Sequence, residues 1–185
     1  MGINKLELAV AALLIGGGWW LSRGDAKQFT VNAQSNARYS VPTEVWTLAK
    51  PAYDGDTLTV TRGAEQVKVR FACVDAPELK QPMGEQARNY LRSLIVSANN
   101  QVSIKVVDSD RYGRKVSVVY AGGEILQEKL AGQGLAMVYS QYLNNCPQPE
   151  RDRIVAAEQS ARTARRGMWA SANPQTPWDY RRQKR

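Results

Sequence analysis

Histidine is absent from the 185 residues of the sequence. This absence excludes every mechanism that needs an imidazole, including Ser-His-Asp and Cys-His hydrolysis, histidine-based phosphodiesterases and histidine-ligated zinc. The two cysteines, Cys73 and Cys146, are too few for an all-cysteine zinc site or for the usual iron–sulfur cluster with four thiolates. A bound metal ion would therefore have oxygen ligands, as calcium, magnesium and manganese do.

Long apolar runs are also scarce, and the clearest one lies near the N-terminus. Residues 8–21 carry no charge, and charged residues flank them on both sides. Fourteen residues is the length of the apolar region of an export signal and is short for a membrane span. The alternative, a buried core helix, is disfavoured by Gly16, Gly17 and Gly18, because glycine weakens helices.

We therefore expect residues 1–23 to be a signal peptide or a signal anchor. Trp19 and Trp20 end the apolar run, where amphipathic rings favour a membrane interface, so retention as a membrane anchor stays open. Residues 24–41 are rich in polar and charged side chains, which is typical of a spacer. Together these segments predict an extracytoplasmic location, periplasmic or secreted, with or without an anchor formed by residues 8–21.

Acidic residues are outnumbered by basic ones. The chain has 25 Lys and Arg against 17 Asp and Glu, a formal net charge of +8 at pH 7. Its 43% of apolar residues is an ordinary globular content, so we expect one folded domain over residues 42–170. A basic balance favours polyanions or an anionic membrane surface as partners. After this domain, residues 171–185 predict a basic, flexible tail, in which residues 178–185 follow two prolines.

The hydrophobic pattern of the domain predicts an α+β fold. Alternating apolar residues indicate five strands, in the segments 45–48, 57–61, 67–73, 102–107 and 116–120. A helix over 84–96 is expected between the third strand and the fourth. A short helix is expected from about Glu124 to Ala131, and a last helix has Ile154, Ala161 and Met168 on one face. Five strands with about three helices in this order predict a Greek-key β-barrel of the OB type, which often binds oligonucleotides.

Two acidic clusters stand at expected strand ends. Asp56 lies in the turn sequence Tyr-Asp-Gly-Asp-Thr, and Asp75 and Glu78 lie in Val-Asp-Ala-Pro-Glu. Either cluster alone is an ordinary solvated turn. Together with Arg70 and Arg114, which also lie near strand ends, they place acids and arginines on one barrel.

Phosphodiester cleavage needs this combination of groups. Hard oxygens hold a divalent cation that polarises a phosphoryl oxygen, and a carboxylate orients or deprotonates water. Arginines stabilise the charge of the five-coordinate transition state, and their planar donors match phosphate better than lysine does. The clusters therefore predict hydrolysis of phosphodiesters.

Four stretches occur in order along the chain: DGDTLTV, VRFACVDAPE, DRYGR and QGLAMVY. Together they resemble the staphylococcal nuclease (thermonuclease) family over roughly residues 44–169. The resemblance implies an OB-fold enzyme that hydrolyses DNA and RNA with Ca²⁺ and low specificity and leaves 3′-phosphate ends. It also implies a monomer.

The resemblance further implies a role for each matching residue. Asp56, Asp75 and the main-chain carbonyl of Ala76 match the calcium ligands, although many members of the family have threonine in place of Ala76. Arg70 and Arg114 match the arginines that bind phosphate and stabilise the transition state. Glu78 matches the carboxylate that positions or activates the attacking water.

A nucleotide pocket and a disulfide also follow from the resemblance. Arg111 and Tyr112 match residues that hold a terminal 3′ phosphate; a solvated hairpin tip is the alternative. Tyr139 and Tyr142 fall near two tyrosines that face the base and sugar, although this chain is one residue shorter there. In the family fold Cys73 and Cys146 lie at places that are close together, so a disulfide is expected, with two unrelated thiols as the alternative.

Two other classes of function remain open from the sequence. One is a catalytically silent OB module that binds single-stranded nucleic acid at the cell envelope, and the other is a membrane-tethered interaction domain. Asp56, Asp75 and Glu78 favour the nuclease, because carboxylates that face phosphates would weaken a protein that only binds nucleic acid.

Overall fold

The computed structural model describes residues 39–184. The expected leader, residues 1–23, and most of the expected spacer lie outside the described residues. Within residues 39–184, none of the helices has the length and apolar character that crossing a membrane requires.

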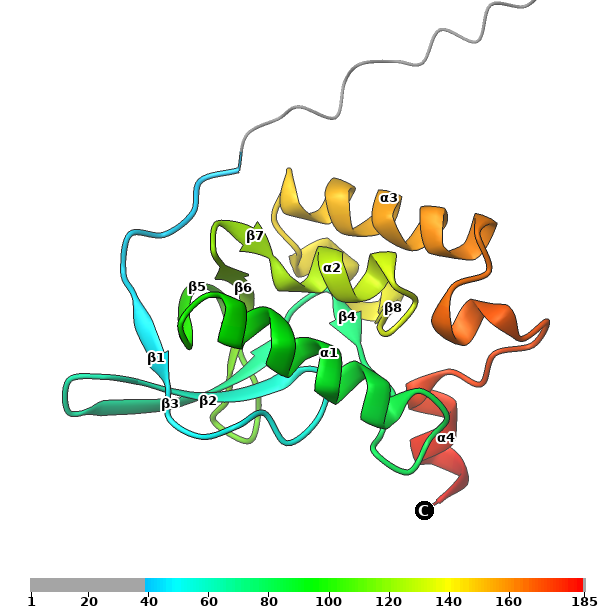
Figure 1. Cartoon of the computed structure of the whole chain (residues 1–185), viewed down its shortest axis with the longest axis horizontal. Helices are drawn as coiled ribbons and strands as arrows, with labels where there is room; N and C mark the ends of the chain where they lie inside the picture. Colours follow the sequence, from blue (N-terminus) through cyan, green and yellow to red (C-terminus); the bar gives the residue numbers. More distant parts are fainter. Residues whose placement is uncertain (1–38, 185) are drawn as a thin grey trace, which may run out of the picture. The chain divides into compact units, whose positions relative to one another are not determined.

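A closed barrel of five strands forms the centre of the fold (Figure 1). Its strands are β1 (Trp46–Leu48), β2 (Thr57–Arg62), β3 (Glu65–Phe71), β5 (Gln101–Ser109) and β6 (Lys115–Ala121). Neighbours pair antiparallel in the order β3-β2-β1-β5-β6, and a parallel pairing of β3 with β6 closes the barrel. The α+β class and the five-stranded barrel predicted from the sequence are thus confirmed.

Alternation of side chains explains why these segments are strands. In β3, Val69 and Phe71 are buried, whereas Lys68 is exposed and Arg70, which lies between them, is half-buried. In β2, Leu58 and Val60 are buried on the same side of the strand. A period of two places the apolar side chains inside the barrel and leaves the others, Arg70 among them, outside it.

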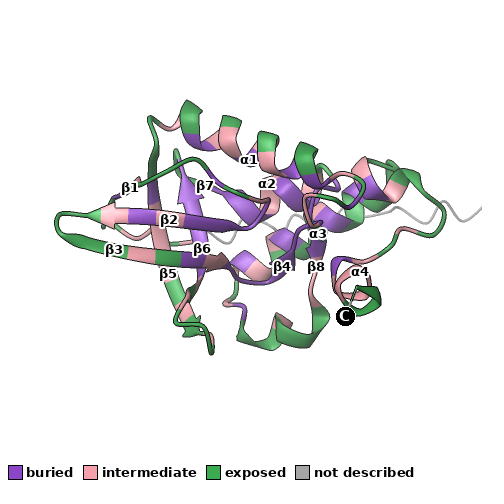
Figure 2. Ribbon diagram, turned by 90° about the horizontal axis from the view of Figure 1, so that it is seen from below, coloured by how far each residue is buried: buried purple, intermediate pink, exposed green. Residues whose placement is uncertain are grey.

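Helices cover the barrel. The first, α1 (Gly84–Ser97), buries Ala87, Leu91 and Ile95, which are four residues apart and therefore share one face. Figure 1 shows α2 (Leu126–Gly132) between α1 and α3 (Glu150–Thr163). In Figure 2 the outer side of α1 is exposed and its inner side is buried.

Two helix boundaries differ from the sequence prediction. The helix expected from Glu124 begins at Leu126, because Glu124–Ile125 forms a short strand, β7, that pairs with β6. The last predicted helix ends at Thr163, and Met168 lies in a separate 3-10 helix, η2 (Gly167–Ala170).

A second small sheet stands beside the barrel. Its strands, β4 (Val74–Asp75) and β8 (Met137–Val138), are antiparallel, and Asp75 lies opposite Met137. A 3-10 helix, η1 (Ser140–Asn145), follows β8 and leads to Cys146, which forms a disulfide with Cys73 at a Cα–Cα distance of 5.5 Å. The disulfide and β4–β8 pairing fix the chain around Asp75 to the segment that carries the tyrosines.

The C-terminal segment differs most from its prediction. Where the sequence analysis expects a flexible tail, residues Pro177–Gln183 form a helix, α4. Thr176 caps this helix by accepting a hydrogen bond from the Asp179 N–H at 3.2 Å, and it donates one to Asp179 Oδ2 at 2.7 Å. Pro177 occupies the first turn and is buried. Local capping and contact with the domain therefore order this segment.

Candidate active site

The first acidic residue, Asp56, is placed by the turn before β2. Asp54 Oδ1 accepts hydrogen bonds from the N–H groups of Asp56 and Thr57 at 3.2 and 2.8 Å, which closes the turn. Between these residues, Gly55 allows a close approach, since a Cβ there would lie 2.7 Å from the Ala76 Cβ. The turn therefore packs directly against the second acidic segment, and Asp56 is 2% exposed.

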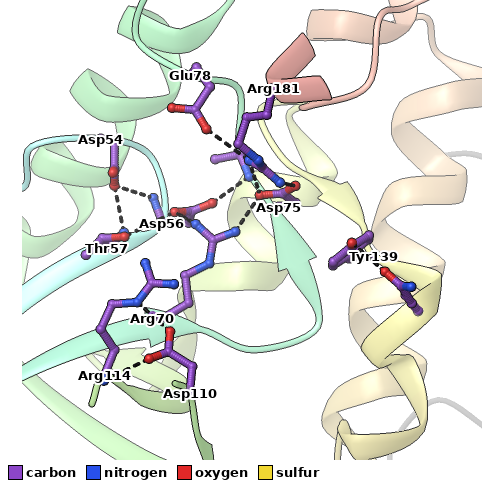
Figure 3. A network of polar contacts seen from close by, with 12 residues as sticks. Asp54, Asp56, Thr57, Arg70, Asp75, Glu78, Asp110, Arg114, Tyr139 and Arg181 are labelled. Atoms are coloured by element: carbon purple, nitrogen blue, oxygen red, sulfur yellow. Dashed lines mark hydrogen bonds and ion pairs between the residues drawn. The ribbon is translucent and has the colours of Figure 1, made fainter. Parts of the chain in front are cut away.

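Arg70 joins the two acidic segments (Figure 3). Its Nη1 donates to Asp56 Oδ1, and its Nη2 donates to Asp75 Oδ1. Both carboxylates are buried, and the Arg70 side chain is 19% exposed. Because β3 and β6 run side by side in parallel, with Arg70 paired to Val116, the start of β6 lies next to this group.

Burial changes the electrostatics of Asp56. Loss of water around the carboxylate raises the pKa of Asp56 to about 7, although the charge of Arg70 acts in the opposite direction. The N–H of Ala76 also donates to Asp56 Oδ2 at 2.7 Å, which favours the charged form. An additional cation beside Asp56 would favour ionisation in the same way.

Asp56, Asp75 and Ala76, the three calcium ligands that the resemblance implies, thus lie together. Their donor set fits a hard cation, because carboxylate and carbonyl oxygens are the ligands that calcium prefers. Among residues 39–184, however, no three His, Cys, Asp or Glu side chains come close enough together to hold a metal ion. In this arrangement guanidinium groups, rather than further carboxylates, lie against the acids.

Glu78 joins the group from the loop that precedes α1. Its N–H donates to Gln81 Oε1 at 3.3 Å, and its carbonyl accepts from the Gln81 N–H at 2.8 Å. Its Oε1 accepts from Arg181 Nη1 at 2.9 Å, and its side chain is 42% exposed. Glu78 therefore lies partly exposed to solvent at the edge of the buried pair.

Arg114 approaches the cluster from the start of β6. Its Nε donates to Asp110 Oδ2 at 2.6 Å, and its main-chain N–H donates to Asp110 Oδ1 at 3.0 Å. Burial would raise the pKa of Asp110, but these hydrogen bonds outweigh it, and the pKa lies below its ordinary value. In Figure 3 the guanidinium of Arg114 points toward that of Arg70. The two arginines predicted to contact phosphate lie on one side of the site.

Arg111 and Tyr112 form the tip of the hairpin between β5 and β6. The Arg111 guanidinium lies 5.0 Å from the centre of the Tyr112 ring, and that of Arg114 lies 5.6 Å from it. Tyr112 is 69% exposed. The structure thus connects these residues to the site through Arg114 rather than by direct contact with the acids.

Tyr139 and Tyr142 lie on the other side of the site, after β8. Their ring centres are 5.2 Å apart, and Tyr142 is exposed. Tyr139 also stacks on Trp178 of α4, with ring centres 5.0 Å apart and planes inclined by 22°. Burial, followed by the charge of Asp75, raises the pKa of Tyr139.

Arg181 and Trp178 are the site residues that the sequence analysis missed. Both lie in α4, which was expected to be flexible, so they were assigned no place in the site. A usable signal was present: Thr176, Pro177 and Asp179 have the spacing of a capping box with proline in the first turn. That pattern predicts a helix start, but it says nothing of where the helix docks.

A closed barrel with buried carboxylates and arginines at the ends of its strands defines a class, the OB-type barrels with an acidic and arginine-rich site. The family model described as "Staphylococcal nuclease homologue" matches residues 68–171, more than half of the chain. The chain belongs to the staphylococcal nuclease family.

Several relatives share this similarity. An uncharacterized endonuclease of Haemophilus influenzae is 36% identical over 134 residues, which cover 71% of this chain and 70% of that protein. A micrococcal nuclease of Shigella flexneri is 36% identical over 138 residues, with 70% and 76% covered. The probable staphylococcal-like nuclease CAN3 of Oryza sativa subsp. japonica is 38% identical over 122 residues. The chain spans only 30–35% of the length of the plant relatives that it matches.

Proposed function

We propose that this protein is a calcium-dependent nuclease of low specificity that hydrolyses phosphodiester bonds of DNA and RNA. The observation that carries the proposal is the meeting of Asp56, Asp75, Arg70 and Glu78 at one end of the barrel, with Arg114 beside them. Membership of the staphylococcal nuclease family supports it. So do the names of the bacterial relatives, an endonuclease and a micrococcal nuclease.

The chemistry assigns a task to each group. Water attacks phosphorus, and its proton passes to Glu78. The bond from phosphorus to the 5′ oxygen breaks, and the departing oxygen takes a proton from solvent, leaving a 3′ phosphate and a 5′ hydroxyl. Arg70 and Arg114 stabilise the charge on the equatorial oxygens of the transition state. A calcium ion held by Asp56, Asp75 and the Ala76 carbonyl would polarise a phosphoryl oxygen.

Binding of the nucleotide uses the two flanks of the site. Arg111 and Tyr112 hold the terminal phosphate, and Tyr139 and Tyr142 offer ring faces to a base. Stacking on an aromatic ring tolerates any base, which suits a nuclease of low specificity. The protein acts as a monomer in this proposal.

The proposal extends to location: the domain works outside the cytoplasm, where it cannot degrade the cell's own nucleic acids. The apolar run over residues 8–21 and the bond between Cys73 and Cys146 support an oxidising compartment reached by export. Outside the cytoplasm calcium is abundant enough to fill a site of modest affinity.

The test is an assay of the full chain with single- and double-stranded DNA and RNA. We expect cleavage with calcium, none with a chelator, and products whose ends accept labelling only after removal of a 3′ phosphate. Cleavage that persists in chelator would contradict the calcium requirement. Binding of single strands without cleavage, in calcium, would instead favour a silent OB module.

A further inference from the structure

The C-terminal helix places a third guanidinium against the acidic cluster. Arg181 Nη2 lies 2.5 Å from Asp75 Oδ2, and Arg181 Nη1 lies 3.2 Å from Asp75 Oδ1 and 2.9 Å from Glu78 Oε1. Figure 3 shows Arg181 reaching from α4 to these carboxylates. With Arg70 on Asp75 Oδ1 as well, both oxygens of this buried carboxylate carry a cationic partner.

These oxygens are the ones that a divalent cation would need. Asp75 Oδ1 accepts hydrogen bonds from two guanidinium groups and has no lone pair left for a further cation, whereas Oδ2 accepts one, from Arg181. The positive charge of Arg181 also repels a cation at this distance. Docking of Arg181 and binding of a cation by Asp75 therefore exclude each other.

Further contacts hold the same segment across the site. Trp178 stacks on Tyr139, one of the rings assigned to the base. Gln81 is 5% exposed, and its Oε1 accepts a hydrogen bond from the Glu78 N–H. Its Nε2 donates a hydrogen bond to the carbonyl of Gln175 at 2.7 Å. Pro177 is buried. The segment thus contacts both the cation side and the base side of the site.

We propose that α4 is an intramolecular latch, with Arg181 in the place of the divalent cation and Trp178 over the ring where a base would stack. The inference rests on the proposed function, since it concerns the cation and the nucleotide of that site. The latch keeps the site closed until the cation displaces Arg181 or a base displaces Trp178.

The contacts allow the latch to open. The Arg181 side chain is 37% exposed, so water reaches one side of its ion pairs. A helix of seven residues is unstable on its own in water, so α4 is expected to melt once its contacts are lost. The apparent affinity for calcium then equals the intrinsic affinity multiplied by the open fraction.

The first test measures calcium binding by titration calorimetry with the full chain and no nucleic acid. Arg181→Gln removes the charge that competes for Asp75, so we expect calcium to bind about tenfold more tightly, or about 1.4 kcal/mol. Arg182→Gln is the matched control: it removes the same charge from the next residue, which pairs with Asp179 on the same helix. We expect its calcium affinity to equal that of the unchanged protein.

The second test follows the helix itself by hydrogen exchange. Saturating calcium should accelerate exchange of the amides of residues 177–183 in the unchanged protein, because the cation displaces Arg181. Amides of α1, which contributes no ligand to the proposed cation site, should keep their protection. Unchanged protection of residues 177–183 in saturating calcium would overturn the latch.

The outcomes separate the latch from the function on which it rests. If the unchanged protein and Arg181→Gln bind calcium equally, or the variant binds more weakly, the latch is wrong and the nuclease proposal stands. If neither the unchanged protein nor Arg181→Gln binds calcium, and neither cleaves nucleic acid, the latch and the nuclease proposal are both wrong. Should Arg181→Gln fail to fold, Trp178→Ala loosens the same segment, and calcium affinity must rise in it for the latch to hold.

Discussion

Arg70 forms ion pairs with two buried carboxylates at once. Asp56 and Asp75 are both buried, and the guanidinium of Arg70 joins one oxygen of each. Removing one partner from a buried ion pair leaves an uncompensated charge and typically costs about 3–5 kcal/mol. A substitution of Arg70 therefore affects both stability and catalysis, which makes it a poor test of a purely catalytic role.

Arg114 offers the cleaner test, because its ion-pair partner, Asp110, is in the same hairpin and partly exposed. We expect Arg114→Lys to lower kcat about 10²–10³-fold, since lysine keeps the charge but loses the planar pair of donors. The midpoint of thermal unfolding should change little. The measurement is steady-state cleavage of DNA and RNA in calcium.

A matched control for this substitution is Arg62→Lys. Arg62 lies at the far end of β2 and pairs with Glu44 and Glu65, away from the acidic cluster. Its kcat should equal that of the unchanged protein. A kcat of Arg114→Lys within twofold of the control would remove Arg114 from the site.

Glu150 gives the clearest pH prediction. Burial acts to raise its pKa, but hydrogen bonds from Lys105 at 2.7 Å and from Tyr120 at 2.6 Å outweigh it, so the pKa lies below 4.5, its ordinary value. Because the pKa of Glu150 is lower in the folded state, the ionised carboxylate adds to the free energy of unfolding above pH 4.5. This contribution is lost as the pH falls through the folded pKa.

Glu150→Gln should therefore flatten the acid limb of the stability curve. At pH 7 we expect it to cost about 1.5–3 kcal/mol, because the charged partner of Lys105 is lost. Below pH 4.5 the difference from the unchanged protein should shrink. The free energy of unfolding in urea, measured between pH 3 and 7, checks this. A constant difference over that range would contradict the lowered pKa.

At the residue scale, the sequence showed some of the site and hid the rest. Asp56, Arg70 and Asp75 stand in motifs at strand ends, and the structure brings them together. The sequence shows Asp54 only as part of a turn, whereas its hydrogen bonds to the N–H groups of Asp56 and Thr57 show that it holds that turn closed. Arg181 has no local pattern that connects it to Asp75, because 106 positions separate them.

At the scale of elements, the barrel strands were predictable because burial follows their alternating pattern. The pair β4 and β8 was not, since two residues each are too few to show a period. The position of Asp75 depends on this pair, which sets it opposite Met137. The sequence could thus place Asp75 near a strand end, whereas its neighbours in space follow from the pairing.

The disulfide between Cys73 and Cys146 ties these elements together. A bond that closes a loop of 73 positions restricts the unfolded chain and is expected to contribute about 4 kcal/mol to stability. We expect reduction to lower the midpoint of urea unfolding strongly. The Cys73→Ala, Cys146→Ala double variant should unfold at that lower midpoint with or without reductant.

Thiol titration of the unfolded, unreduced protein from its native compartment completes this test. If no free thiol reacts and the mass is that of a monomer, the disulfide between Cys73 and Cys146 is present in the cell. Two free thiols per chain would show that the protein carries the cysteines reduced there.

At the scale of the whole molecule, the barrel domain was predictable, but the relation of the C-terminal segment to that domain was not. Composition indicates that residues 171–185 are basic and polar, which is typical of a solvated tail. The structure instead docks α4 against the site through Trp178 and Arg181. Docking depends on the shape and charge of a surface that is assembled from residues far apart in the sequence. The composition of the C-terminal segment describes neither the shape nor the charge of that surface.

The last prediction concerns where the whole molecule resides. The apolar run over residues 8–21 and the bond between Cys73 and Cys146 both favour an exported domain. Cell fractionation should place the folded domain outside the cytoplasm, and protease added to intact cells, after removal of any outer membrane, should degrade it. Full-length protein protected in the cytosol would contradict export. The mass of the mature N-terminus then decides between the alternatives, because a cleaved signal removes the apolar run and an anchor retains it.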